Sequence, residues 1–204
     1  MRSPFAILLL ILFTRLEGQT LGGNTVFNFL KLPNTPQLSA LGGINLSQPS
    51  NDIGLAFYNP AQLRPDMHTQ LNAVFNNHYA GIKAYHLSLG YSNERIQTNF
   101  LWGLQYLSYG EIQETDASGN LFGILRPTDW VMHLSASRSY LEKWNYGGTL
   151  KFINSNYGQY RSNGVAMDIG LSYRDSSKLF YASVLAKNMG FQLRSYAGTE
   201  AADL

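Results

Sequence analysis

Side chains that could carry catalytic or redox chemistry are few in this sequence and do not fall into reactive patterns. There is no cysteine, which excludes disulfides, thiol nucleophiles and cysteine-ligated metals. No lysine follows a serine at the Ser-x-x-Lys spacing, and the Gly-x-Ser-x-Gly, His-Glu-x-x-His, Walker and Rossmann patterns do not occur. We therefore predict a non-enzymatic protein with no catalytic residue and no cofactor.

Four histidines remain as candidate metal ligands: His68, His78, His86 and His133. His78 and His86 flank one expected hairpin and could approach each other. No pair, however, has the helical spacing or the cysteine partner of a recognised metal site. We predict rim or lumen positions for the histidines and no metal site.

Three charged residues, Lys151, Asp168 and Arg174, are candidates for the interior of the fold, and a fourth, Lys187, also falls on an inward face or near a strand end. They fall on strand faces whose other residues are mostly small or polar. We predict that they line a wet lumen, where they form pairs and hydrate the interior. A selectivity filter is the alternative.

The elements that position these residues are predicted to be strands. From Val165 to Arg174 the odd positions are apolar and end in a tyrosine, whereas the even positions are small or charged. A period of two places these sets on opposite faces of a sheet. Less regular versions of the pattern occupy 84–91, 100–107, 130–137 and 144–153, and aromatic residues such as Tyr85 and Tyr91 bracket the apolar face.

Strand length and composition favour a membrane setting. A tilted transmembrane strand needs about ten residues, as found here, whereas strands of a soluble β-sandwich, the alternative, have about five or six. Charged residues make up 14% of the chain, against ~25% in soluble proteins. Lysines and arginines are scattered singly, which argues against nucleic acid as a partner. We predict an all-β fold, an antiparallel outer-membrane β-barrel in contact with lipid over residues 69–204.

Residues 1–18 are predicted to form a secretory signal peptide. Arg2 precedes an unbroken apolar run, Phe5 to Phe13, that is too short to span a bilayer. Cleavage is expected between Gly18 and Gln19, and a buried N-terminal helix is the alternative. Sec export would bring the protein to the outer membrane of a Gram-negative bacterium.

Residues 19–68 differ from the strand region and are predicted to form one strand and a short helix. The strand is expected over Ala40–Ser47. Asp52 could cap a helix over 53–58, which the Asn59-Pro60 step would end. Such a segment could fold into the barrel mouth as a plug, and a Gly-rich linker is the alternative.

Several short motifs follow one another in this segment. They are Phe-Leu-Lys-Leu-Pro at 29–33, Ala-Leu-Gly-Gly-Ile-Asn at 40–45, Asn-Asp at 51–52 and Phe-Tyr-Asn-Pro-Ala at 57–61. Their order resembles the PorV/PorQ group of the type IX secretion system, and its PorQ branch more closely. The motif residues, to which the resemblance assigns a structural role, are Ala40, Gly42, Gly43, Asn45, Asn51, Asp52, Tyr58, Asn59, Pro60 and Ala61.

This resemblance implies a fold similar to the FadL-like outer-membrane transporters, with fourteen strands and an N-terminal region near the periplasmic mouth. It also implies a non-enzymatic role in anchoring or assembling surface-attachment partners. For the PorQ branch the expected partner is the surface protein PorZ, in a complex with PorU and PorV. The alternative is a FadL-like transporter of hydrophobic small molecules.

The sequence departs from this family in its number of strands. From residue 69 we count about eight strand-length segments, and the polar residues 199–204 lack a closing strand. We therefore expect residues 69–204 to be the incomplete, N-terminal part of a barrel, with a complete small barrel as the alternative. The acidic stretch 110–128 is expected to be either an outward loop or one more short hairpin.

Overall fold

The computed structural model describes residues 26–116 and 118–196. The predicted signal peptide, with its cleavage site at Gly18 and Gln19, lies outside these ranges. Within them, no helix is long and apolar enough to cross a membrane.

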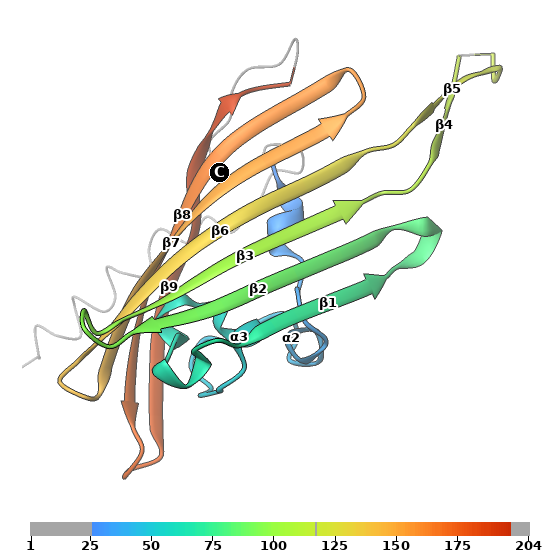
Figure 1. Ribbon diagram of the computed structural model, residues 1–204. Coiled ribbons are helices and arrows are strands. Elements are labelled where there is room, and N and C mark those ends of the chain that lie inside the picture. Colours follow the sequence, from blue (N-terminus) through green and yellow to red (C-terminus); the bar gives the residue numbers. More distant parts are fainter. Residues whose placement is uncertain (1–25, 117, 197–204) are drawn as a thin grey trace, which may run out of the picture.

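The main element is a seven-stranded antiparallel sheet with the order β1-β2-β3-β6-β7-β8-β9 (Figure 1). Its strands are β1 (Leu71–Asn77), β2 (Lys83–Asn93), β3 (Thr98–Ser108), β6 (Thr128–Tyr140), β7 (Trp144–Tyr157), β8 (Tyr160–Asp175) and β9 (Phe180–Arg194). The predicted all-β, antiparallel architecture is thus confirmed. The sheet is open in the described residues, with β1 and β9 at its edges, so the predicted barrel is not closed.

Two further strands, β4 (Ile112–Thr115) and β5 (Leu121–Leu125), form a separate hairpin. This hairpin continues from β3 and β6 and projects past the end of the sheet (Figure 1). The described part of the chain therefore contains nine strands, seven in the sheet and two in a hairpin formed by the acidic 110–128 stretch, whereas about eight were expected. The other connections at the same end span 78–82 and 158–159, whereas 94–97, 141–143 and 176–179 lie at the opposite end.

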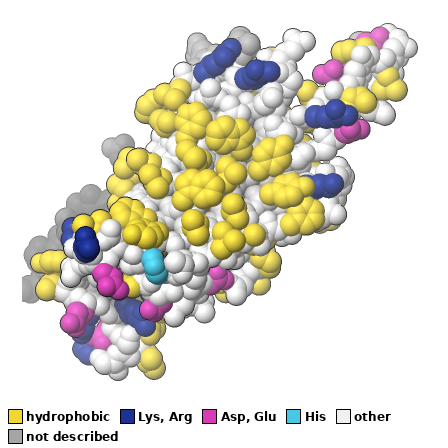
Figure 2. Space-filling view, in the orientation of Figure 1, with side chains coloured by type: hydrophobic (Ala, Val, Ile, Leu, Met, Phe, Trp, Pro, Cys, Tyr) yellow, Lys and Arg dark blue, Asp and Glu magenta, His cyan; other side chains and the backbone are white. Residues whose placement is uncertain are grey.

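The two faces of the sheet follow the predicted alternation, but apolar residues occupy the exposed face. Leu134, Leu150 and Val184 are 55%, 65% and 73% exposed, whereas Ser135 and Lys151 on the other face are 2% and 4% exposed. Figure 2 shows apolar side chains gathered over the exposed face. We call this face the outer face, and the buried polar face the inner face. A soluble sheet has the opposite arrangement.

The N-terminal segment (residues 26–68) packs on the inner face as a series of short turns. These are η1 (Asn28–Lys31), α2 (Pro36–Ala40), α3 (Ile53–Ala56), η2 (Pro60–Gln62) and η3 (Pro65–Met67); a further turn, η4 (Tyr79–Gly81), connects β1 and β2. Many apolar side chains of the N-terminal segment, including Phe29, Ile53 and Leu63, are buried. Leu32, Leu41, Ile44 and Leu46 of the same segment are exposed. The segment therefore supplies much of the apolar core that the polar inner face lacks.

The strand expected over Ala40–Ser47 does not form. Thr35 caps α2 instead, because its side chain accepts a hydrogen bond from the Leu38 amide (3.2 Å) and Pro36 occupies the first helical turn. The helix ends at a turn in which Gly42 and Gly43 have φ angles of 75° and 83°, a conformation favoured by glycine.

The helix expected over 53–58 forms only as α3. Asp52 caps it as predicted, accepting a hydrogen bond from the Gly54 amide at 2.8 Å. After α3 the side chain of Asn59 accepts from the Ala61 amide and caps η2. The Asn-Pro step thus ends one helical turn and begins another.

Candidate functional site on the inner face

Two facing glycines hold the Asn59-Pro60-Ala61 turn against the sheet. Gly147 of β7 and Gly170 of β8 are directly paired across the strands. A Cβ atom on Gly147 would lie 2.7 Å from the carbonyl carbon of Pro60, and one on Gly170 would collide with Asn59. The turn can therefore approach the backbone only because both positions lack a side chain.

Phe57 also packs closely against a glycine of the sheet, in the part formed by β2, β3 and β6. Its ring lies between His86 and His133, with centroid distances of 4.2 and 4.1 Å, and directly above Gly103. Both histidines are thus on the inner face, whereas His68 is at the rim and accepts a hydrogen bond from the Ser92 amide. The described residues contain no cluster of His, Cys, Asp or Glu suited to a metal ion.

Buried amides fasten the N-terminal segment to β8 and β9. Asn59 is fully buried and its amide donates to the Leu46 carbonyl (2.9 Å) and the Ser183 hydroxyl (3.0 Å). Gln62 donates to the same carbonyl and to the Ser172 hydroxyl (3.1 Å). These bonds satisfy polar groups on both surfaces, as buried polar groups require.

A buried ion pair lies at the centre of the β7-β8-β9 part of this face. The Lys151 ammonium is 2.6 Å from the Asp168 carboxylate, and both side chains are at most 2% exposed. Lys151 also donates to the side chain of Asn188 (2.7 Å), whose backbone amide donates to Asp168 (2.7 Å). The site thus joins Lys151 and Asp168, two of the three charged residues assigned to the lumen.

A β-bulge in β9 places Asn188 in this network. The β8-β9 register shifts between Met167 and Ile169, and Asn188 has a φ of 56°. Ala186 and Met189 both pair with outer-face positions, so Lys187 and Asn188 lie inward between them. Bulges commonly redirect side chains in this way. The bulge was not predicted, although the alternation in the sequence changes phase there: Val184 and Ala186 are apolar at even positions, then Met189, Phe191 and Leu193 at odd positions.

Lys187 reaches the N-terminal segment through Tyr58. Its ammonium lies 3.4 Å from the centroid of the Tyr58 ring, a cation–π contact. Burial of Tyr58, with a smaller contribution from the negative charge of Asp168, raises the pKa of the phenol. The tyrosine therefore stays neutral and presents its ring to the lysine.

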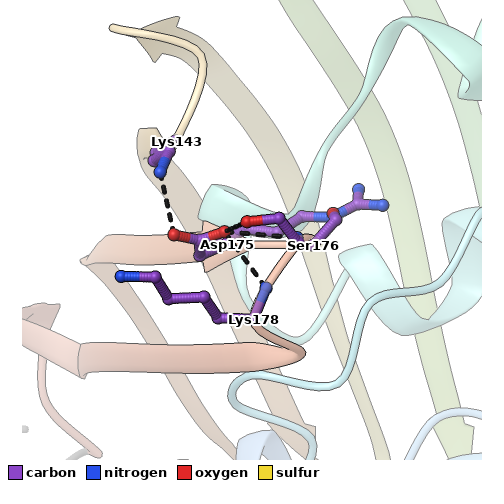
Figure 3. A network of polar contacts seen from close by, with 6 residues as sticks. Lys143, Asp175, Ser176 and Lys178 are labelled. Carbon is purple, nitrogen blue, oxygen red and sulfur yellow. Dashed lines mark hydrogen bonds and ion pairs between the residues drawn. The ribbon is translucent and has the colours of Figure 1, made fainter.

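Arg174, the third charged residue assigned to the lumen, does not join this network. It lies near the β8-β9 turn, where its guanidinium donates to the Ser176 hydroxyl (3.1 Å). Burial lowers the pKa of Arg64 in the N-terminal segment, and the positive charge of Arg174 lowers it further. Next to Arg174, Asp175 accepts from Lys143 (2.8 Å), joining the β6-β7 and β8-β9 turns (Figure 3).

The motif residues of the N-terminal segment are not gathered at one place. Tyr58, Asn59, Pro60 and Ala61 touch the sheet, and Asp52 caps α3. Asn45 is buried and bonds with Gln48 in its own turn, whereas Ala40, Gly42 and Asn51 are exposed. Gly43 follows Gly42 in the turn after α2 and is half-buried. Residues 58–61 therefore make the contact with the strands.

Comparison of the chain with protein-family models and with curated proteins finds no match.

Proposed function

We propose that the sheet is part of the wall of an outer-membrane β-barrel, with the outer face against lipid and the N-terminal segment as an internal plug. The observation that carries this proposal is the inverted distribution of polarity, with a charge-poor apolar face exposed and a polar face buried. Lipid would cover the exposed face, and closure of the wall would remove the unpaired edges that a bilayer excludes.

Rows of aromatic residues on the outer face support this placement. Phe75, Tyr85, Tyr106 and Trp130 lie opposite one another across β1, β2, β3 and β6. A second row, Tyr140, Trp144 and Tyr173, crosses β6, β7 and β8 toward the other end. Two such girdles are typical of the interfaces of a membrane barrel.

The direction of the edge strands restricts how the wall can close. Neighbouring strands are antiparallel throughout, so β1 and β9 at the two edges run in the same direction. All-antiparallel closure then requires an odd number of additional strands. The fourteen-stranded wall implied by the resemblance to the PorV/PorQ group meets this condition.

Within this wall we propose an anchoring or assembly role in the type IX secretion system. The buried amides of Asn59 and Gln62 and the turn seated on Gly147 and Gly170 hold the plug firmly, which favours a scaffold over an open channel. Barrels usually have short periplasmic turns and longer outer connections, so the β4-β5 hairpin is assigned to the cell surface. PorZ, with PorU and PorV, is the proposed partner. The bulge at Asn188, which interrupts the wall, and the cavity beside it favour FadL-like transport.

The hairpin provides the test of the anchoring role. Replacing Phe122 with serine at its exposed tip should reduce co-purification of the PorZ-type protein about tenfold or more, since exposed aromatic anchors dominate many interfaces. Leu141→Ser is the matched control, because Leu141 and Phe122 are 71% and 70% exposed but lie at opposite ends of the sheet. Equal recovery with the two variants would contradict the proposed anchoring role of the hairpin.

A further inference from the structure

A cavity of about 440 Å³ lies between the N-terminal segment and the bulge of β9. Its walls include apolar groups of Leu30, Pro33, Ile44 and the Tyr58 ring, and Lys187 and Asn188 of the bulge. The lining also includes the exposed Lys31, whose ammonium donates to the Asn28 side chain. Small-molecule sites typically have volumes of about 300–1,000 Å³ and combine apolar walls with a few polar groups. The cavity therefore has the size and lining of a site for a compact organic molecule.

The Lys187 amine has no carboxylate partner among the described residues. Asp168, the nearby carboxylate, is already bonded to Lys151 and to the Asn188 amide. Among the described residues, none of the ion pairs includes Lys187, and its ammonium contacts the neutral Tyr58 ring. With both lysines in their ammonium forms, this end of the cavity carries one positive charge more than the Asp168 carboxylate balances.

The bulge in β9 brings Lys187 to the inner face. The buried ion pair uses Lys151, Asp168 and Asn188 and needs no second lysine. Without the bulge, Lys187 and Asn188 would face opposite sides of the sheet. The irregular strand therefore places the Lys187 amine, which has no carboxylate partner, beside the apolar groups of the cavity.

We propose that this cavity binds a compact organic monoanion. Its carboxylate or sulfonate group would accept hydrogen bonds from Lys187, and its apolar body would pack against Leu30, Pro33, Ile44 and Tyr58. A charged acceptor strengthens such bonds in a partly buried site. The site consists of the N-terminal segment and β9 alone, so it does not depend on the anchoring role.

Calorimetric titration of the full chain in dodecyl maltoside micelles tests this proposal. The probes are 4-phenylbutyrate and its neutral analogue 4-phenylbutanamide, which differ in charge but little in shape. The wild-type protein should bind the carboxylate about tenfold or more tightly than the amide, because a hydrogen bond to a charged group is stronger. Equal affinities, or no binding of the carboxylate, would overturn the proposal.

Three variants locate the site. Lys187→Met should remove the preference for the carboxylate and leave binding of the amide unchanged, which also shows that the variant is folded. Lys83→Met, on an exposed strand residue outside the cavity lining, should bind as the wild type does. Ile44→Trp fills the cavity from a position that is 57% exposed and should weaken binding of both probes. Retention of the carboxylate preference in Lys187→Met, or unaltered binding in Ile44→Trp, would place the ligand elsewhere and refute the proposal.

Discussion

Replacing Leu134 with arginine is expected to destabilise the membrane-inserted protein by about 2–4 kcal/mol, the range found for a basic residue at the middle of the lipid face of a barrel. Leu134 lies on β6 between the two aromatic rows and is 55% exposed. In lipid the arginine would lose its hydration without gaining a partner. Urea-dependent unfolding from phospholipid vesicles measures this loss.

Ile124→Arg is the matched control for this prediction. Ile124 is 59% exposed, close to the value for Leu134, but it lies on the projecting β4-β5 hairpin. If the main sheet is in lipid and the hairpin is in water, only Leu134→Arg should be destabilising. Equal stability of the two variants would indicate that water covers the outer face.

Replacing Asp168 with asparagine should lower the free energy of unfolding by about 3–5 kcal/mol, the range for removing one partner of a buried ion pair. The asparagine oxygen can still accept the Asn188 amide, so shape and this hydrogen bond are retained. The change leaves the Lys151 ammonium, 2% exposed, without its counter-ion.

Two further variants separate charge from shape in this prediction. Glu111→Gln removes one partner of an ion pair whose side chains are 71% and 59% exposed, and should change stability by about 1 kcal/mol or less. The double variant Asp168→Asn/Lys151→Met removes both buried charges and should recover part of the loss. If the Asp168→Asn variant unfolds like Glu111→Gln, the buried pair does not stabilise the fold as described.

The strands and their two faces could be predicted from the sequence because alternation is a local pattern. The run Val165 to Arg174 places Asp168 inward and Ile169 outward in both the prediction and the structure. The lysine that pairs with Asp168 is on a neighbouring strand, and the register Thr149↔Asp168 brings Lys151 within reach. Alternation predicted the faces of these residues, whereas their pairing depended on the strand register.

The N-terminal segment was harder to predict because contacts with the sheet determine its shape. The sequence pattern predicts that Gly42 and Gly43 belong to a strand, although Thr35-Pro36 is a helix-start signal. The positions that receive this segment, Gly147 and Gly170, are separated from it by many residues and carry no motif of their own. Their function becomes visible only when the strands bring them together under Pro60.

Arg174 shows a further limit of the alternation pattern. It has the same parity as Asp168, which predicted a lumen position, but it lies beside the turn that begins after Asp175. Near the end of a strand a side chain can reach the rim, and Arg174 bonds there with Ser176. Alternation along a strand therefore predicts the side of the sheet on which a side chain lies, but not how far it lies from the end of the strand.

Spin-label accessibility tests most directly whether the outer face contacts lipid. The chain has no cysteine, so single cysteines at successive positions 165–173 can each carry one label. In vesicles we predict a period of two: labels at Met167, Ile169 and Leu171 should be accessible to oxygen and protected from a water-soluble nickel chelate. If labels at these three positions were as accessible to the nickel chelate as a label at Phe122 on the hairpin, contact of the outer face with lipid would be contradicted.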